Sequence, residues 1–335
     1  MQSDVGPKVS IVICVYNGRR FLDRIFDYLK EQTYDDCETV FVVDGRSDDG
    51  TMEAVVGYCD GNDDARYVVN DSQTLLGGSK NLGLDESKGR YIWFLDVDDV
   101  PSLRFLETMM GIVESEKCDT VVTNFRYIDS HDIQFTEDGE VITMTGDEAV
   151  HSRSNNHIPV TSWSMLYDRE LLQRTGIRFM EGMSEDIVFT YLVLEASDSV
   201  CFYTAPLYGH YLHSNSFCNS NKDLRGRTEM ERYLYLSDHF TEEDVYLQKR
   251  LCLLAVRSMA HMTPSGFSET IKDEKLKGKI GKYFGLMGRF EYRVIRLFPR
   301  SYHFSVNWYI KWVYAKVGKI YTNKGKLRVF CGNRE

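Results

Sequence analysis

The amino-acid sequence predicts an α/β fold, with a mostly parallel sheet that carries helices on both of its faces. Short apolar runs at residues 9–15, 39–43 and 91–95 are rich in Val, Ile and aromatic side chains, as strands buried on both faces are. Between these runs the apolar residues recur at helical spacing, as at residues 21–31. This alternation is typical of parallel sheets, because parallel strands need a crossover connection between them.

The first half of the chain supplies the alternating elements. The strand at 9–15 is broken by Tyr16-Asn17-Gly18, and the helix at 21–31 leads to a strand at 39–43 that ends at Asp44. The next predicted elements are, in chain order, a helix at 52–59, a strand at 67–69, a glycine-rich lead at 77–84 into another helix, and the strand at 91–95. Since Asp44 and Asp96 each end a parallel strand, we expect them at one edge of the sheet.

The pattern changes after Pro101. The predicted elements are a helix at 103–116, a strand at 120–125, a hairpin turn at 137–140, a strand at 163–167, a helix at 169–175 that Gly176 ends, and an acidic lead at 183–186 into the apolar segment 187–194. From residue 225 onward we expect mainly helices. The sequence therefore predicts an α/β domain at residues 1–224 and a helical, basic region at residues 225–335.

Composition excludes several classes of protein. Hydrophobic residues make up 43% of the 335-residue chain and charged residues 27%, which is typical of globular proteins. The eight cysteines are scattered without a Cys-x-x-Cys pair, so we expect reduced thiols and neither a zinc nor a redox motif. The sequence has no signal-peptide apolar region and no apolar run of about 20 residues that would cross a bilayer. We therefore expect a cytoplasmic protein.

Charge is unevenly distributed along the chain. Residues 271–335 contain 16 Lys and Arg against 4 Asp and Glu, whereas the other 270 residues carry a net charge of −22. Residues 302–320 place apolar and aromatic side chains at helical spacing with lysines between them, which suits a helix lying on an anionic membrane. The equally favoured alternative is a helix packed on the α/β domain. Nucleic acid is not expected as a partner, because no base-reading motif accompanies the basic residues.

Three carboxylates crowd the end of the strand at 91–95, namely Asp96, Asp98 and Asp99. Adjacent anions repel one another unless a cation neutralises them, and open α/β sheets bind ligands at the carboxyl ends of their strands. Mg²⁺ and Mn²⁺ prefer oxygen ligands and usually share them with substrate phosphates. The alternative is an acidic turn that caps the following helix.

Residues at another predicted strand end and at a predicted helix start have both a functional and a structural interpretation. Asp44 would accept hydrogen bonds from a nucleobase or ribose, or cap the next helix. Lys80 and Asn81 stand at a predicted helix start, where N–H groups and a cation favour phosphate. The alternative for Lys80 is a surface lysine beside a turn.

A second acidic pair and two histidines lie later in the chain. Glu185-Asp186 offers a carboxylate that would deprotonate an incoming hydroxyl group, although acidic residues also open ordinary helices. His210 and His213 would supply a further metal ligand or contact a pyrophosphate, but histidines in a polar loop are more often structural or solvated.

Taken together, these motifs resemble glycosyltransferase family 2, whose members use nucleotide sugars and have the GT-A fold. The resemblance covers roughly residues 8–220. The matching motifs are Val9-Ser10-Ile11-Val12-Ile13-Cys14-Val15-Tyr16-Asn17-Gly18, Gln32-Thr33-Tyr34, Val43-Asp44, Lys80-Asn81-x-Gly83, Lys88-Gly89-Arg90-Tyr91-Ile92, Phe94-Leu95-Asp96-x-Asp98-Asp99, Leu166-Tyr167, Glu185-Asp186-x-x-Phe189 and His213-x-Asn215-Ser216. The most similar subgroup builds bacterial capsule, exopolysaccharide or lipopolysaccharide chains.

The resemblance implies an inverting glycosyltransferase that moves a sugar from a nucleotide-diphosphate sugar, here a UDP-sugar, to a hydroxyl of a growing surface polysaccharide or lipid-linked glycan. It implies that Asp186 is the general base. Asp96 and Asp98 would handle the ribose and a pyrophosphate-bound Mn²⁺ or Mg²⁺, with His210 or His213 as a further metal ligand. The implied nucleotide-sugar-binding residues are Val15, Tyr16, Asn17, Asp44, Lys80, Asn81, Asp96, Val97, Asp98 and Glu185. The implied partners are the donor, a glycan or lipid-linked acceptor, and an anionic membrane surface contacted peripherally through residues 271–335.

Three positions depart from the family pattern. The family usually has Asp-Asp-Gly-Ser after the second strand, whereas this chain has Asp44-Gly45-Arg46-Ser47; Lys80 and Tyr211 stand where arginine is common. Arg46 motivates an alternative, a sugar-nucleotide-binding or scaffold protein without turnover, although such a protein needs no base at Asp186. A nucleotidyltransferase would need a first loop richer in glycine and lysine than residues 16–20.

Overall fold

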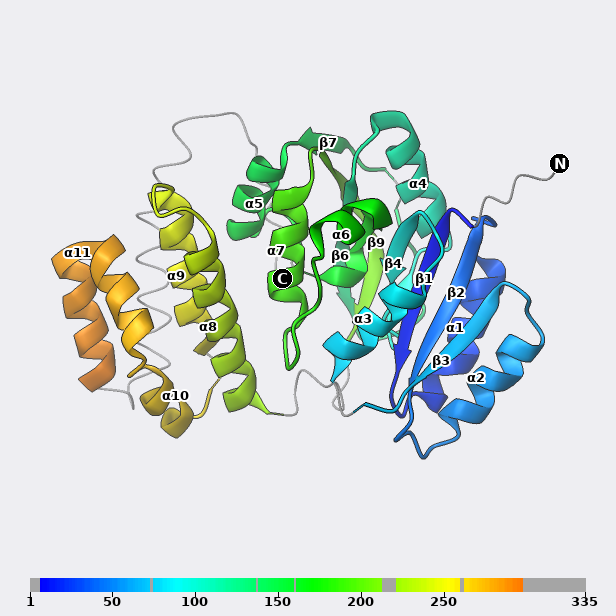
Figure 1. Ribbon diagram of the computed structural model, residues 1–335, viewed down its shortest axis with the longest axis horizontal. Helices are drawn as coiled ribbons and strands as arrows, with labels where there is room; N and C mark the ends of the chain where they lie inside the picture. Colours follow the sequence, from blue (N-terminus) through cyan, green and yellow to red (C-terminus); the bar gives the residue numbers. More distant parts are fainter. Residues whose placement is uncertain are drawn as a thin grey trace. The chain divides into compact units, whose positions relative to one another are not determined.

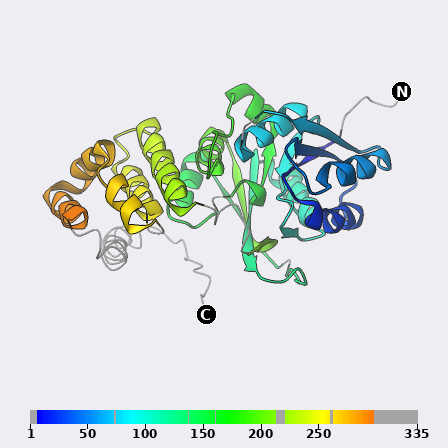
Figure 2. The ribbon, with the colours of Figure 1, turned by 90° about the horizontal axis from the view of Figure 1, so that it is seen from below.

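The computed structural model describes residues 7–72, 75–136, 138–159, 161–212, 221–259 and 262–297. The chain divides into two compact units, residues 1–214 and residues 215–335. The first unit is a sheet with helices on both faces, and the described part of the second unit consists of helices (Figures 1 and 2). The α/β class predicted from the sequence is confirmed.

The first half of the α/β unit forms four parallel strands in the order β3-β2-β1-β4. Its elements are β1 (Val9–Val15), α1 (Arg19–Glu31), β2 (Cys37–Asp44), α2 (Thr51–Asp60), β3 (Ala65–Asn70), α3 (Leu76–Glu86) and β4 (Tyr91–Phe94). The glycine-rich segment forms α3 itself, so Lys80 and Asn81 lie in its second turn rather than at its start. Gly83 lets α3 lie close to the sheet, because a Cβ there would come within 2.3 Å of Val12 Cγ1.

The second half extends the sheet with strands of mixed direction. Its elements are β5 (Val100–Pro101), α4 (Phe105–Glu116), β6 (Thr120–Ile128), β7 (Val141–Met144), α5 (Gly146–Ser154), a 3₁₀ turn at Ser162–Ser164, β8 (Met165–Asp168), α6 (Arg169–Thr175), α7 (Asp186–Ala196) and β9 (Val200–Tyr211). β8 lies antiparallel between β4 and β6, and β6 pairs in parallel with β9. The sheet is therefore parallel in its first half and mixed in its second.

The predicted hairpin turn at 137–140 is wrong. Residue 137 lies outside the described residues, and β7, which follows, pairs antiparallel with β9 instead of folding back on β6. Turn-forming residues mark where a chain reverses, but the partner of the next strand depends on which edge of the sheet is available.

Alternate residues of the central strands pack against different helices. In β4, the Trp93 ring stacks on Phe105 of α4 with ring centroids 4.3 Å apart, whereas Phe94 contacts Phe189 of α7 at 6.1 Å. Side chains of α1 and α2 share the hydrophobic cluster that contains Trp93 and Phe105. This period of two buries both faces of the sheet, which explains the continuous apolar runs in the sequence.

Four helices lie in the described part of the second unit: α8 (Lys222–His239), α9 (Val245–Ser258), α10 (Pro264–Thr270) and α11 (Glu274–Leu297). Asp238 of α8 binds Lys275 and Lys279 of α11, the latter at 2.6 Å. Among the described helices, none is long and apolar enough to cross a membrane. Residues 302–320, for which the sequence predicts a membrane-surface helix, lie outside the described residues.

Candidate functional site

The carboxyl ends of β1, β2 and β4 meet at one edge of the sheet, as predicted. β1 is followed on one side by β2 and β3, and the chain then returns to place β4 on the other side of β1 (Figure 1). Open α/β sheets bind ligands at such a reversal of strand order. Tyr16 follows β1, Asp44 ends β2 and Asp96 follows β4, so these three residues stand at the edge where a ligand is expected.

The three carboxylates that follow β4 have different environments. Asp96 and Asp98 are partly exposed, whereas Asp99 is 1% exposed. Asp99 accepts hydrogen bonds from the Tyr211 N–H at 2.8 Å and from His210 Nδ1 at 3.0 Å, both at the end of β9. Asp99 therefore joins β9 to the turn after β4, which leaves Asp96 and Asp98 as the carboxylates that a ligand could reach.

His210 is held in place by its neighbours. Its ring stacks on Trp163 with centroids 5.3 Å apart, and its Nδ1 is committed to Asp99. Burial lowers the pKa of His210, but the hydrogen bond to Asp99 and the negative charges of Asp99, Asp96 and Asp98 together raise the pKa above its ordinary value. Only Nε2 of His210 is left as a candidate metal ligand, and His213 lies outside the described residues.

Lys80 is at the centre of a buried ionic cluster. Its side chain is 3% exposed, and its Nζ donates to Glu185 Oε1 at 2.8 Å and to Ser162 Oγ at 3.0 Å. The same Nζ lies 3.9 Å from Asp96 Oδ1. Burial lowers the pKa of Lys80, yet the Glu185 and Asp96 charges raise it above its ordinary value, so the ammonium group stays charged. The cluster thus joins α3, the turn after β4 and the start of α7 through one cation.

Asp96 titrates differently from an ordinary aspartate. Burial raises the pKa of its carboxyl group to about 7, against the opposing effect of Lys80. The neighbouring Asp99 and Asp98 carboxylates add to the rise. A carboxylate with a raised pKa is strongly stabilised by any further cation that binds beside it.

The second acidic pair opens α7. Glu185 is 6% exposed at the N-cap position, and Asp186, the first residue of the helix, is partly exposed. The preceding Ser184 has a φ of 51°, an uncommon value for a residue other than glycine. Nearby, the Asn81 side chain bonds both to the N–H and to the carbonyl of Phe179, each at 2.9 Å. Asn81 therefore supports the loop before the pair, and Glu185 is bound to Lys80.

The turn after β2 is joined to the turn after β1. Asn17 Oδ1 accepts from the Asp48 N–H at 2.9 Å, and Asp44 accepts from the backbone and guanidinium of Arg46. Val15 is buried in β1, whereas the Tyr16 ring that follows is 60% exposed. Tyr16 and Asn17 are therefore accessible to a ligand, whereas Val15 is not.

Sequence reasoning missed several residues that support the site. Ser162 Oγ accepts a hydrogen bond from Lys80 Nζ. Arg24 of α1 donates from Nη2 to the Val97 carbonyl at 3.2 Å. Burial lowers the pKa of Arg24, whereas the Asp98 and Asp99 charges raise it. These residues come from segments with no pattern that pairs them with Asp96–Asp99. Arg46 did carry a signal, because it departs from the family pattern.

The partly exposed carboxylates of Asp96 and Asp98 suit a divalent cation that substrate phosphates also bind. Among the described residues, no group of three or more His, Cys, Asp or Glu side chains forms a complete metal cage. Mg²⁺ at phosphate sites is usually bound by one or two carboxylates together with the phosphate oxygens, so it needs no such cage. Asp96 and Asp98 are two carboxylates that could hold such a cation.

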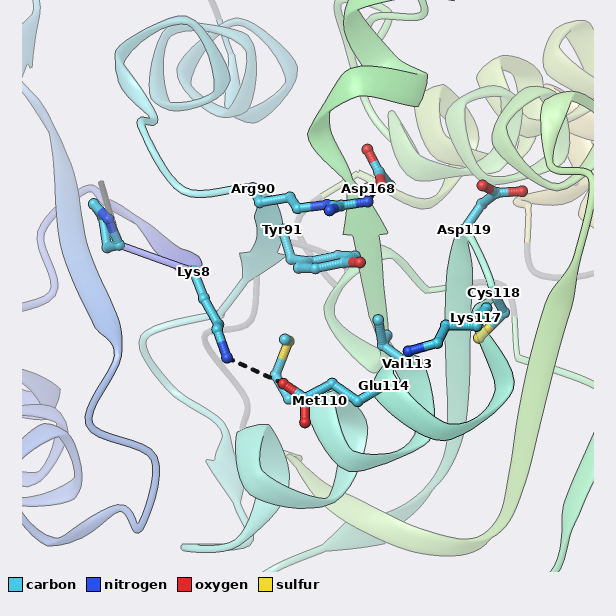
Figure 3. Close-up of a pocket in the computed structure, with 11 residues that line it drawn as sticks. Lys8, Arg90, Tyr91, Met110, Val113, Glu114, Lys117, Cys118, Asp119 and Asp168 are labelled. Carbon is cyan, nitrogen blue, oxygen red and sulfur yellow. Dashed lines mark hydrogen bonds and ion pairs between the residues drawn. The ribbon is translucent and has the colours of Figure 1, made fainter. Parts of the chain in front are cut away.

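A separate pocket of about 400 Å³ lies at the amino edge of the same sheet (Figure 3). Its walls include Lys8, which is 3.1 Å from Glu114, and Arg90, which is 3.5 Å from Asp168. None of the predicted site residues lines this pocket. Since ligands of open α/β sheets bind at the carboxyl edge, the pocket does not alter the assignment of the site.

Curated relatives share the sequence pattern of the first unit. Residues 10–176 match the family model described as Glycosyl transferase family 2. The cholesterol galactosyltransferase of Borreliella burgdorferi is 26% identical over 226 residues, which cover 64% of this chain and 62% of the relative. The putative glycosyltransferase EpsH of Bacillus subtilis is 26% identical over 218 residues, which cover 63% of this chain and 62% of the relative. The match thus spans less than two thirds of each relative's length.

Solved structures share the fold over nearly the whole chain. The S. aureus TarS fragment 1–349 in complex with UDP-GlcNAc aligns with a TM-score of 0.65 at 16% identity, over 96% of this chain and 93% of that chain. The mannosyltransferase PcManGT from Pyrobaculum calidifontis, in complex with GDP-Man and Mn²⁺, aligns with a TM-score of 0.56 at 14% identity, over 92% and 88%. At such identities the likeness concerns the fold alone. Together with the family model, these findings show that the chain belongs to glycosyltransferase family 2.

Proposed function

We propose that this protein is an inverting, metal-assisted glycosyltransferase that moves a sugar from a UDP-sugar to a hydroxyl group of a growing glycan or lipid-linked acceptor. The observation that carries the proposal is the convergence of two acidic motifs on one ammonium group. Lys80 Nζ lies 2.8 Å from Glu185 and 3.9 Å from Asp96, at the edge of the sheet where ligands are expected. A site that only bound a nucleotide would not need the second acidic motif.

In the proposed reaction, Asp186 accepts the proton of the acceptor hydroxyl while the hydroxyl oxygen bonds to the anomeric carbon of the donor sugar. The bond from that carbon to the diphosphate oxygen breaks, and the diphosphate leaves with the electron pair. Attack opposite the leaving group inverts the configuration of the carbon. Glu185, through its bond to Lys80, fixes the start of α7 and hence the backbone of Asp186.

The cofactor in this proposal is Mn²⁺ or Mg²⁺, bound by Asp96 and Asp98, with His210 Nε2 or His213 as a further candidate ligand. When bound, the cation would supply positive charge beside the departing diphosphate. The PcManGT structure was obtained with Mn²⁺, which supports the choice of metal.

The donor and the acceptor are proposed from the relatives and from the charge of the chain. The TarS complex contains a UDP-sugar, and the Borreliella relative is named a cholesterol galactosyltransferase. We extend the proposal to a catalytic domain at residues 1–224 and a basic region at 225–335 that contacts the inner face of the cell membrane peripherally. In α11, Lys275, Lys277, Lys279 and Lys282 each pair with an acidic side chain, so the proposed membrane contact would rest on other basic residues of the region.

The experiment that tests the proposal is nucleotide release from a panel of UDP- and GDP-sugars with Mn²⁺ or Mg²⁺, with wild type compared to Asp186→Asn. Metal-dependent release from one donor, largely lost in Asp186→Asn, is the expected result. Donor binding without turnover, even with crude lipid acceptors, would instead support the sugar-nucleotide-binding alternative, which the pairing of Asp44 with Arg46 motivates.

A further inference from the structure

The segment Asp96–Asp99 after β4 is a tight turn whose two ends are fixed by hydrogen bonds. The Asp99 N–H donates to the Asp96 carbonyl at 3.2 Å, which closes a β-turn with Val97 and Asp98 at its centre. The Asp96 N–H donates to Tyr208 Oη at 3.3 Å, and the Asp99 carboxylate is bound to the end of β9. None of these contacts involves the central peptide group of the turn, which joins Val97 to Asp98.

The central peptide group is held by α1 instead. Arg24 donates from Nη2 to the Val97 carbonyl at 3.2 Å. The Val97 side chain lies beside Gly18, the N-cap of the same helix, where an added Cβ would come within 3.5 Å of Val97 Cγ1. The first helix therefore contacts Val97 both through its backbone carbonyl and through its side chain.

The orientation of this peptide group determines where the Asp98 side chain points. A peptide group is rigid, so a flip of the Val97 carbonyl changes the dihedral angles of both adjoining residues. Such a flip converts a type I turn into type II, which requires a positive φ at the position that Asp98 occupies. Asp98 does not have a positive φ. By holding the Val97 carbonyl, Arg24 opposes the flip and keeps Asp98 in its present direction.

A contribution to stability does not explain the position of Arg24. Its side chain is partly buried, and Nη1 is buried with no hydrogen-bond partner in the part of the chain that the structure describes. One hydrogen bond to a neutral carbonyl offsets only part of the cost of burying a charged group with an unpaired donor. Burial lowers the pKa of Arg24, and the largest opposing effect comes from Asp98. The guanidinium is thus costly where it lies, and its closest electrostatic link is to the candidate cation site.

We propose that Arg24 is a positioning residue of the cation site: through the Val97 carbonyl it holds the backbone of Asp98, so that the Asp96 and Asp98 carboxylates face the same divalent cation. Arg24 acts through the turn and does not touch the cation, which its own charge would repel. This inference rests on the proposed function and adds to it a residue of the first helix on which cation binding depends.

The test is Mn²⁺ binding to the full chain, measured from the electron paramagnetic resonance signal of free Mn²⁺ in the absence and presence of UDP. Arg24→Met is expected to weaken Mn²⁺ binding about 10- to 100-fold, the range for residues that orient metal ligands without binding the metal. An effect of charge alone would have the opposite sign, because removal of a nearby cation favours a divalent ion. Arg24→Lys keeps a charged donor on a long side chain and should recover part of the affinity.

Urea denaturation of the same variants separates positioning from a structural role. Since the guanidinium is partly buried with an unpaired donor, the urea midpoint of Arg24→Met should not fall below that of wild type. Arg20→Met is the matched control, because Arg20 is an exposed arginine of α1 whose guanidinium lies over the Phe21 ring, 4.4 Å from its centroid. It should leave the Mn²⁺ affinity and the urea midpoint unchanged.

Three results would contradict the inference. Mn²⁺ binding that is unchanged or tighter in Arg24→Met would show that Arg24 does not position the carboxylates. Weaker binding together with a lower urea midpoint would show a purely structural role; in both cases the glycosyltransferase proposal stands. A wild type that binds no Mn²⁺, either alone or with UDP, would overturn the metal-assisted function and the inference with it.

Discussion

Replacement of Lys80 by methionine (Lys80→Met) removes the cation from the buried ionic cluster. The exposed fractions are 3% for the Lys80 side chain and 8% for the Glu185 side chain, and the two charged groups are 2.8 Å apart. At an effective dielectric constant of about 20, the attraction across this distance is about 6 kcal/mol, part of which offsets the cost of burying the two charges. Breaking a buried ion pair by removing one partner costs about 3–5 kcal/mol in free energy of unfolding. We expect a loss in this range for Lys80→Met.

The assay is urea denaturation followed by far-ultraviolet circular dichroism, with wild type, Lys80→Met, Glu185→Gln and the double variant forming a thermodynamic cycle. The double variant should be more stable than Lys80→Met, because it no longer buries an uncompensated carboxylate. The matched control is Lys88→Met, since the Lys88 side chain is exposed and should change the free energy of unfolding by less than about 0.5 kcal/mol.

Two outcomes would refute this reasoning. A loss of less than about 1 kcal/mol in Lys80→Met would mean that Glu185 reaches water or another partner once the ammonium group is gone. Strict additivity of the two single variants would mean that the side chains do not interact, despite the hydrogen bond between them.

Three further predictions concern catalysis and pH dependence. Asp186→Asn should lower the rate of sugar transfer by about 100-fold or more, measured as nucleotide release, with the donor Kd nearly unchanged because a general base acts on the acceptor. Removal of divalent cations with EDTA should abolish transfer, and added Mn²⁺ should restore it in wild type but only weakly in Asp98→Asn; full activity in EDTA would contradict the metal proposal. Burial raises the pKa of Glu38, but the hydrogen bond from Arg66 helps hold it below its ordinary value of 4.5. The stabilisation that Glu38 contributes is therefore present above pH 4.5 and lost as the pH falls through the lower folded-state pKa, and Glu38→Gln should flatten that acid-side decline in a urea-denaturation series.

The sequence was sufficient to predict the elements of the first half of the sheet. There each strand is buried on both faces and each helix has one apolar side, so the composition of a short segment already determines its type. The sequence also predicted that Asp44 and Asp96 lie at the same edge of the sheet, because the carboxyl ends of parallel strands lie together. These inferences need only neighbouring residues and the geometry of a parallel sheet.

The second half could not be predicted in the same way. β8 inserts antiparallel between β4 and β6, although more than 30 residues separate it from either strand in the chain. No local pattern encodes such a pairing, since several edges of the growing sheet can accept a strand of similar composition. The wrong hairpin turn at 137–140 has the same cause, because β7 pairs with β9, which follows much later.

The side chains of the site show why a motif does not by itself define chemistry. In the sequence, Asp96, Asp98 and Asp99 are three aspartates in one acidic turn, and only the resemblance to the family singles out Asp96 and Asp98. In the fold, Asp99 is committed to the His210 ring and to a backbone N–H of β9, which removes it from the edge where a ligand would bind. Lys80 was expected to face phosphate, yet its charge is directed at two carboxylates inside the protein. In both cases the role of a charged group is decided by a segment that returns to it from about 100 residues later in the chain. For a charged residue in such a site, the residue that it binds in the fold therefore predicts its function better than the sequence motif in which the charged residue stands.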